Sequence, residues 1–466
     1  MIEPCGTIDP EIGKLNNLTT LDLSENQFSG PITPAIGNLS KLNLLYLNAN
    51  NFSGTIPSEI GNLNLVTYLL LGDNQLSGQL TNINTNLTSL QILLVANNEI
   101  SGNIPWDLFT FNITNIDLSN NVLEGSSMPL DIDRFPSLIS INLAMNKLSG
   151  RIPYTIGNLS ALSGLILHSN QLLGEIPFSV CNLTSLSYFH LSNNNLEGAI
   201  PQCLGNSSPS LQVLHLRANN FHGHLPSTFD GTILQDSNNE LPFPKLQVFD
   251  ISKNKFNGSL PSRYLNNFRA MMDVKENGIG KENWFSYFQE TIVFVLKGLE
   301  LPVVRILTTF TTIDLSDNRF SGTIPQNIGS LNSLRYLNLS RNNITGNIPA
   351  SLGNMSILES LDLSSNRLVG EIPLPLNMLT SLSRLNLSFN NLVGRIPQIG
   401  QLATFENKSY FWRAVILGYV SGFVFGTTIG YFIFRYERPK WFVGLFFNAH
   451  DKINGKRKRK VARQKT

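Results

Sequence analysis

Leucine and other apolar residues recur along most of the chain in one frame of about 24 residues. The segment from Leu18, LTTLDLSENQFSGPITPAIGNLSK, and the segment from Leu334, LRYLNLSRNNITGNIPASLGNMSI, share the frame LxxLxLxxNxLxGxIPxxIGNLxx. The frame restarts fourteen times, at 18, 42, 66, 90, 113, 138, 162, 186, 211, 246, 310, 334, 358 and 382. Self-similarity at such a period is typical of a solenoid in which each repeat contacts only its neighbours. The pattern therefore predicts one elongated body.

Each repeat has the signature of one short strand. Its two central leucines alternate with polar residues, which favours a strand whose leucines point into the core. The asparagine that follows carries both hydrogen-bond donors and an acceptor, so we expect it to satisfy backbone groups of neighbouring coils. Leaving such groups unpaired costs about 1–3 kcal/mol each. The glycine and proline of GxIP then form a turn in each coil, and the IGNL segment returns the chain along the convex side.

Two stretches depart from the frame. The repeat that begins at 246 overruns by about forty residues, so we place an insertion at 262–309. Residues 219–245 are also irregular, and the stretch TFDGTILQDSNNELPFPK within them is predicted to form a loop. The other predicted boundaries are 1–17 before the first full repeat, 18–261 for repeats one to ten and 310–405 for repeats eleven to fourteen.

An apolar segment follows the repeats. Residues 414–434 form a run of 21 residues without a charge, enough for a helix to cross a hydrocarbon core of ~30 Å. The tail 435–466 holds eleven Lys or Arg and two acidic residues, a net charge of +9, whereas the rest of the chain has a net charge of −7. Such a basic excess places the tail in the cytoplasm and the repeats outside the cell, with 406–413 as the juxtamembrane segment. The KRKRK run at 456–460 is interpreted as an anchor on anionic lipid of the bilayer rather than as a nuclear signal.

Glycine occurs at every fourth position of the apolar segment, at Gly418, Gly422, Gly426 and Gly430. This spacing forms a shallow groove on one helix face, where a partner helix can approach closely. The alternative is that glycine is simply common in transmembrane helices. Three overlapping GxxxG units favour a packing face.

The G-x-I-P mark, in GTIP at 54, GNIP at 102, GRIP at 150 and GEIP at 370, resembles the leucine-rich-repeat family in its plant extracellular subtype. An insertion four repeats before the apolar segment, ending in VLKGLELPVVRILTTFTTIDLS, resembles the island of plant receptor-like proteins, and RYERPKWF from 435 resembles the segment after their membrane span. The resemblance implies an α/β-type leucine-rich-repeat solenoid, with a curved parallel sheet on its concave side, plus one transmembrane helix.

The same resemblance implies a single-pass receptor at the plasma membrane that binds an extracellular peptide, protein or glycan. The 32 residues after the span contain no glycine-rich phosphate loop, no HRD-type loop and no DFG, so we expect the receptor to signal through a membrane-bound receptor kinase. Plant defence is the setting that the resemblance favours. A receptor that acts in development would have the same architecture and bind a different ligand. We expect no cofactor, no catalysis and no nucleic-acid partner.

Two alternatives remain open. The first is an inhibitor of secreted microbial hydrolases, since soluble wall proteins share this type of repeat, although the span and the insertion disfavour it. The second is a non-functional copy. The first residues, MIEPCGTIDPEIG, show neither the basic nor the apolar region of a signal peptide, and the cysteine-bearing caps of the family are not seen. We therefore expect an incomplete gene model or a degenerate receptor.

The position between the two strand leucines points to the concave surface, and eight repeats carry Asp or Asn there. Apolar or aromatic side chains at this position have no core to join, which indicates a contact surface; random drift between repeats is the alternative. The candidate contact residues are Tyr46, Leu70 and Leu94 at this position, together with Tyr68.

Three histidines come from successive coils, with Arg217 beside the last: His168, His190 and His215. In an acidic cell wall, charged His190 and His215 would form with Arg217 a pocket for an acidic group. The alternatives are ordinary surface histidines and a metal site; a metal site is disfavoured because no cysteine or carboxylate is obviously placed to complete it. Trp284 and Tyr287 of the insertion are further candidate anchors, against the alternative that they pack on the solenoid.

Covalent modification is indicated at two kinds of residue. Cys181 and Cys203 lie in neighbouring coils and are a candidate disulfide, although their positions in the repeat differ by two. A glycan on a concave strand, at Asn338 or Asn386, would block a ligand, so any ligand is expected to bind elsewhere. The glycosylation sequons, all of which precede the apolar segment, begin at Asn17, Asn38, Asn51, Asn86, Asn112, Asn158, Asn182, Asn206, Asn257, Asn338, Asn343, Asn354, Asn386 and Asn407.

Overall fold

The computed structural model divides the chain into two units, 1–397 and 398–466. The residues that it describes are 6–80, 87–109, 112–204, 209–226, 243–260, 262, 265, 268–272 and 310–397, with the backbone of 292–296 and 299–303. The predicted span 414–434 with its four glycines, the segment 406–413 and the tail 435–466 lie outside these residues. Within the described part, none of the helices has the length and apolar character needed to cross a membrane.

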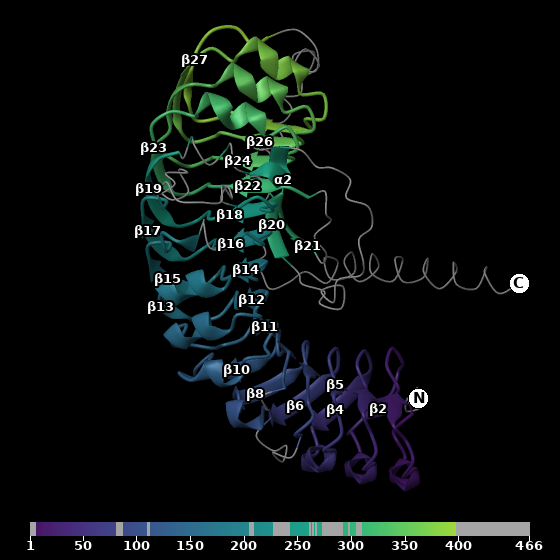
Figure 1. The fold of residues 1–466 in the computed structure, drawn as a ribbon. Helices are drawn as coiled ribbons and strands as arrows, with labels where there is room; N and C mark the ends of the chain where they lie inside the picture. Colours follow the sequence, from purple (N-terminus) through teal and green to yellow (C-terminus); the bar gives the residue numbers. More distant parts are fainter. Residues whose placement is uncertain are drawn as a thin grey trace, which may run out of the picture. The chain divides into compact units, whose positions relative to one another are not determined.

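The predicted parallel sheet is confirmed. Fourteen strands pair in chain order, each with the next, and each begins two residues after a predicted repeat start (Figure 1). The strands are β1 (Thr20–Asp22), β3 (Leu44–Tyr46), β5 (Tyr68–Leu70), β7 (Ile92–Leu94), β9 (Asn115–Asp117), β11 (Ser140–Asn142), β12 (Gly164–Ile166), β14 (Tyr188–His190), β16 (Val213–His215), β18 (Val248–Asp250), β22 (Thr312–Asp314), β24 (Tyr336–Asn338), β26 (Ser360–Asp362) and β28 (Arg384–Asn386).

Three smaller parallel sheets accompany this large sheet, and the sequence analysis did not predict them. They lie where the frame reads NxLxG, which we had interpreted only as a turn. Gly54 has a φ of 76°, so glycine lets the chain leave each short strand in a conformation that other residues rarely adopt. The strands are β2 (Ser29–Gly30), β4 (Asn51–Thr55), β6 (Gln75–Gln79), β8 (Glu99–Asn103) and β10 (Val122–Glu124); β13 (Leu173–Glu175), β15 (Asn195–Gly198), β17 (Asn220–Gly223), β19 (Lys255–Ser259) and β23 (Arg319–Ser321); and β25 (Thr345–Asn347), β27 (Arg367–Gly370) and β29 (Asn391–Leu392).

The IGNL segments form short 3₁₀ helices. Neighbouring helices pack closely. A Cβ atom built on Gly157 would lie 2.2 Å from the backbone oxygen of Ser179 in the next coil, so only glycine fits there. The helices are η1 (Pro10–Lys14), η2 (Pro34–Asn38), η3 (Ser58–Asn62), η5 (Trp106–Leu108), η6 (Ile132–Arg134), η7 (Tyr154–Asn158), η8 (Phe178–Asn182), η12 (Gln326–Ser330), η13 (Ala350–Asn354) and η14 (Leu374–Met378).

The insertion has a different structure in its described parts. A short helix, α2 (Arg269–Met272), packs its Met271 into the interior. Two strands, β20 (Ile292–Leu296) and β21 (Leu299–Val303), pair antiparallel, which sets them apart from the parallel repeats.

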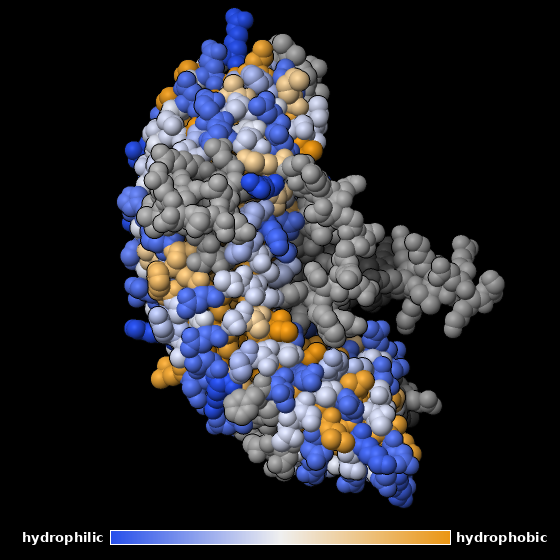
Figure 2. Space-filling model, viewed as in Figure 1, coloured by the Kyte–Doolittle hydropathy of each residue, from blue (hydrophilic) through white to orange (hydrophobic). Residues whose placement is uncertain are grey.

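The core is one column of apolar side chains that continues from coil to coil. Leu45, Leu69 and Leu93 from three neighbouring strands are almost completely buried. Phenylalanines add a second line, with the rings of Phe221 and Phe256 6.3 Å apart. Because these side chains turn inward, the described surface seen in Figure 2 is largely hydrophilic, with scattered hydrophobic groups.

The recurring asparagine links adjacent coils as predicted. Asn50 donates from Nδ2 to the backbone oxygens of Leu23 in the previous coil, at 2.8 Å, and of Leu47 in its own, at 3.2 Å. Its Oδ1 accepts from the backbone N–H of Phe28, at 3.0 Å. The same arrangement recurs at Asn74, Asn98, Asn121, Asn146, Asn170, Asn194, Asn219, Asn254, Asn318, Asn342, Asn366 and Asn390.

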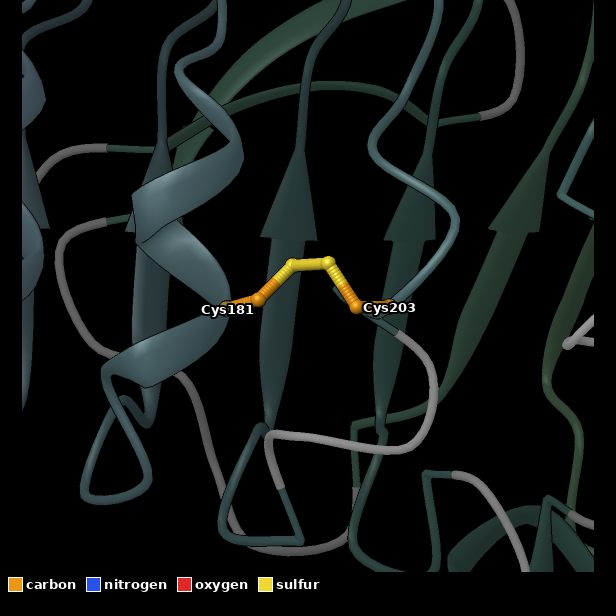
Figure 3. Close-up of a disulfide and its surroundings, with 2 residues drawn as sticks. All are labelled: Cys181 and Cys203. Carbon is orange, nitrogen blue, oxygen red and sulfur yellow. A yellow bond between two sulfur atoms is a disulfide. The ribbon is translucent and has the colours of Figure 1, made fainter.

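One disulfide joins two coils. Cys181 lies in η8 and Cys203 in the following coil, with their Cα atoms 5.7 Å apart (Figure 3). The pair was left open in the sequence analysis because the two cysteines differ by two positions within their repeats. The structure nevertheless joins them.

Candidate functional site

The Asp and Asn side chains of the concave surface are occupied by their own sheet. Oδ1 of Asp362 accepts from the backbone N–H of Ser364 at 3.0 Å and from its hydroxyl at 2.6 Å. Between strands, Nδ2 of Asn386 donates to Oδ2 of Asp362 at 3.0 Å. The sequence signal for this arrangement is a serine two residues after the Asp or Asn. Such residues form a self-satisfied polar ladder, so the departures from it are the better candidates for recognition.

The first departure is an apolar patch on β3, β5 and β7. Tyr46, Leu70 and Leu94 occupy one row of this patch, because the strands pair them in register. Tyr68 lies in the neighbouring row, between two residues that the sequence analysis missed, Leu44 and Ile92. All six side chains are intermediate in exposure.

Leu44 and Ile92 were missed because only the position between the strand leucines was compared. The residue that begins each strand faces the same side, since side chains alternate along a strand. In other repeats this residue is polar at Thr20, Asn115 and Thr312, whereas Tyr188, Val213, Val248 and Tyr336 are aromatic or apolar. We call the six residues on β3, β5 and β7 the apolar patch.

The second departure is a column of stacked imidazole rings. The ring centroids of His168 and His190 are 4.1 Å apart, and those of His190 and His215 are 4.3 Å apart with an angle of 10° between the planes. Nε2 of His215 lies 3.1 Å from Oδ2 of Asp250, the residue beside it on β18. Arg217 donates from Nη1 to the hydroxyl of Ser252 at 3.1 Å. The structure therefore brings all four predicted residues into one cluster.

Burial sets the charges of this cluster. His190 and His215 are 2% and 1% exposed. Burial, followed by the charge of His215, lowers the pKa of His168 to about 3. Burial, with His168 and His215 as neighbours, lowers the pKa of His190 well below its ordinary value. The prediction of a charged His190 in an acidic wall is therefore wrong, because a buried imidazole stacked between two others resists protonation.

The carboxylates beside the column have opposite shifts. Burial opposes ionisation of Asp250, but the neighbouring His215 and Arg217 lower its pKa overall. Burial, together with the charge of Asp250, raises the pKa of Asp314 to about 7. The sequence analysis found no carboxylate near the histidines, because it interpreted Asp250 as an ordinary Asp of the repeat. The pairing of neighbouring strands was the signal that could have found it.

Other candidates fall outside this surface. Among the described residues, no three His, Cys, Asp or Glu side chains are grouped so as to hold a metal ion. Trp284 and Tyr287 lie outside the described residues, as do the sequon residues Asn86, Asn206 and Asn407.

Family models for leucine-rich repeats match the chain in several segments. One, described as Leucine rich repeat, matches 308–368. The other, described as Leucine Rich Repeat, matches 17–39, 41–63, 137–159, 185–207, 210–231, 358–379 and 381–402. These segments follow the repeats that the structure shows.

Known proteins similar to the chain include receptor-like proteins of Arabidopsis thaliana. It is 32% identical over 235 residues to Receptor-like protein 18 of Arabidopsis thaliana, which is 50% of this chain and 24% of that protein. The fold is similar to that of a TDR receptor, with a TM-score of 0.68, 28% identity, and coverage of 84% of this chain and 59% of that one. It is also similar to the Arabidopsis receptor kinase HAESA, solved in complex with the peptide hormone IDA and the co-receptor SERK1, with a TM-score of 0.60, 27% identity, and coverage of 85% and 66%. The match thus spans about a quarter of the curated relative.

Proposed function

The chain belongs to the leucine-rich-repeat family, and we propose that it is the recognition part of a plant receptor-like protein that binds an extracellular peptide on its concave sheet. The apolar patch carries this proposal. Its six side chains interrupt the polar ladder, and unlike His190 and His215 they are partly exposed. Burying one such side chain against a ligand yields about 1.5–3 kcal/mol, so two or three contacts suffice for measurable binding.

A peptide is the ligand class that the geometry favours. A chain laid across β3, β5 and β7 meets a new pair of patch residues about every 4.8 Å, the spacing of neighbouring strands. Tyr46 and Tyr68 add rings with a polar tip, which suits contacts that are part apolar and part hydrogen-bonded. The similar receptor kinase HAESA was solved with a peptide hormone and a co-receptor, which supports the same class of ligand and partner here.

Signalling in this proposal runs through a partner. The uncharged run 414–434 crosses the plasma membrane, its glycine face packs against a helix of a membrane-bound receptor kinase, and 435–466 lies on anionic lipid in the cytoplasm. The repeats then face the cell exterior, and plant defence is the setting that the resemblance to receptor-like proteins favours. A protein or glycan ligand is the alternative to a peptide on the same surface.

Selection of short random peptides displayed on phage tests the recognition surface. Peptides are selected against the folded repeats and then measured against the double variant Leu70→Asp with Leu94→Asp, which places two charges in the patch. We expect affinity to fall more than tenfold, since two apolar contacts are lost. Asp22→Asn, in the same row on β1, is the matched control and leaves affinity unchanged. Selected peptides that bind wild type and the double variant equally would overturn the proposal.

A further inference from the structure

We propose that asparagine-linked glycans are confined to the outer surfaces of the repeats, and that Asn338 and Asn386 stay unmodified although each begins a sequon. The tripeptide is Asn-Leu-Ser at Asn338, Asn386, Asn38 and Asn158 alike. The tripeptide itself therefore cannot separate these four sites. Their hydrogen bonds and exposure do.

The two concave asparagines use their amides inside the sheet. Nδ2 of Asn338 donates to Oδ2 of Asp314 at 3.1 Å. Its Oδ1 accepts from the hydroxyl of Ser340 at 2.8 Å and from the Ser340 backbone N–H at 3.1 Å. Ser340 is itself 8% exposed. A sugar on Nδ2 would occupy the space between Asn338 and the neighbouring strand. The Ser340 hydroxyl, which completes the sequon, is already hydrogen-bonded to the Asn338 side chain.

Asn386 repeats this arrangement two coils later. It donates to Oδ2 of Asp362 at 3.0 Å, and its Oδ1 accepts from the hydroxyl of Ser388 at 2.8 Å. Both asparagines are intermediate in exposure and end a strand of the large sheet. A glycan leaves Nδ2 only one of its two hydrogens, and its bulk beside the neighbouring strand would displace the bond to the buried or half-buried carboxylate.

The same tripeptide has the opposite geometry on the helices. Asn38 and Asn158 end η2 and η7, and both are exposed. The backbone N–H of Ser160 donates to the backbone oxygen of Asn158 at 3.0 Å, rather than to its side chain. The Asn158 amide donates to Asp133 at 2.9 Å, but this contact is exposed and water can replace it. Asn182 and Asn354 end η8 and η13 and are also exposed.

The remaining described sequons lie in loops or at the smaller sheets and are exposed: Asn17, Asn51, Asn112, Asn257 and Asn343. Glycans at the exposed asparagines leave the concave strip from β22 to β28 bare. A ligand or partner is therefore not excluded from this strip, which reverses the expectation drawn from the sequence. The inference concerns modification and does not depend on the receptor role.

Peptide mapping tests the proposal directly. The full chain is directed into the secretory pathway of plant cells by a cleavable signal and is purified from their membranes or medium. Its glycans are released in heavy-oxygen water by an amidase that converts each modified asparagine to a mass-labelled aspartate. We expect the label on Asn38 and Asn158 and none on Asn338 and Asn386. Label on Asn338 or Asn386 in folded, secreted protein would overturn the proposal, and so would its absence from both Asn38 and Asn158.

A pair of variants separates modification from structure. Asn158→Gln should lose one glycan, seen as a faster band on a gel, and keep the unfolding midpoint of the wild type. Asn338→Gln should leave the band unchanged and lower the midpoint, since the longer side chain moves the amide away from Asp314. A faster band for Asn338→Gln contradicts the proposal. If that variant is not secreted, the wild-type peptide map alone decides.

Discussion

Single amides hold neighbouring coils together, and Asn219 is the sharpest place to test this. It is buried and donates to the backbone oxygens of Leu191, Leu216 and Arg217 at 2.9, 3.1 and 3.3 Å. Asn219→Asp removes every donor and buries a charge, so we expect a loss of about 3–5 kcal/mol in the free energy of unfolding. Urea titration followed by circular dichroism measures it.

Asn26 is the matched control for this substitution, because it holds the same position in the first repeat. It is exposed, and among the described residues its side-chain amide donates to carbonyls of its own coil, those of Leu23 and Ser24. Asn26→Asp should cost far less, since water replaces the lost donors. Equal losses at the two positions would show that burial and cross-coil bonding do not explain the role of this asparagine.

Asp314 gives the fold a pH dependence of known sign. Burial, with the charge of Asp250, raises its folded pKa from 3.8 to about 7. Between these values the folded state binds more protons at this site than the unfolded state does. This carboxyl therefore lowers stability as pH rises from about 4 to about 7, by at most about 1.4 kcal/mol per pH unit, and adds no further change above pH 7.

Asp314→Asn removes this titration and keeps an oxygen that can accept from Ser316, as Asn338 does from Ser340. We expect the variant to gain stability relative to wild type as pH rises from 4 to 7. His168 and His190 are present in both proteins, so the difference between the two reports Asp314 together with its effect on the neighbouring Asp250. Denaturant midpoints at several pH values measure it, and a difference that stays constant across this range would refute the assignment.

The residue scale also limits what sequence alone reveals. The histidines were recognised as neighbours because strand pairing follows from the repeat. The lowered pKa values of His168 and His190 were missed because burial on a concave surface is not visible in a period of two. Asp250 was missed for a related reason. An aspartate at this repeat position can belong either to the polar ladder or to the histidine column, and the sequence is the same in both cases. Identical Asn-Leu-Ser tripeptides likewise begin at half-buried strand ends and at exposed helix ends.

Among the elements, the 3₁₀ helices test how closely coils approach. A Cβ on Gly157 would lie 2.2 Å from the Ser179 backbone oxygen, and no flexible side chain is there to move. Gly157→Ala should therefore force η7 and η8 apart and cost about 1–3 kcal/mol.

Gly6→Ala is the control for Gly157→Ala, since its Cβ would meet only the Phe28 ring at 3.9 Å. Thermal unfolding of both variants measures the difference. A Gly157→Ala protein as stable as Gly6→Ala would show that the helices can separate at no cost.

The elements also show which patterns were sufficient for prediction. Every strand of the large sheet was placed, because two inward leucines and an asparagine give each repeat an unambiguous strand signal. The smaller sheets were missed because strands of two to five residues with one inward side chain, such as Phe52 in β4, show no full period. The glycine at the end of these short strands was correctly interpreted as a turn residue. The strand that leads into the turn was not predicted.

At the scale of the whole molecule, Asp and Asn alternate from repeat to repeat in the C-terminal part of the polar ladder. Asp314, Asn338, Asp362 and Asn386 alternate on neighbouring strands, and each Asn donates to the Asp before it. Removing residues 334–357 deletes one complete repeat and places Asp362 beside Asp314. Removing residues 334–381 deletes two repeats and places Asn386 beside Asp314, so the donor is kept.

We therefore expect the two deletions to differ in pH dependence rather than in core packing alone. Stability in a solenoid is close to a sum over repeats and their interfaces, so the larger deletion loses more apolar burial. The smaller deletion joins two carboxylates without a donor between them, and like charges at this spacing disfavour ionisation. Its stability should fall steeply as pH rises from 4 to 7, whereas that of the larger deletion should fall no more than in wild type. Urea midpoints across this pH range measure both. A parallel response in the two deletions would mean that the alternation of Asp and Asn does not couple the repeats.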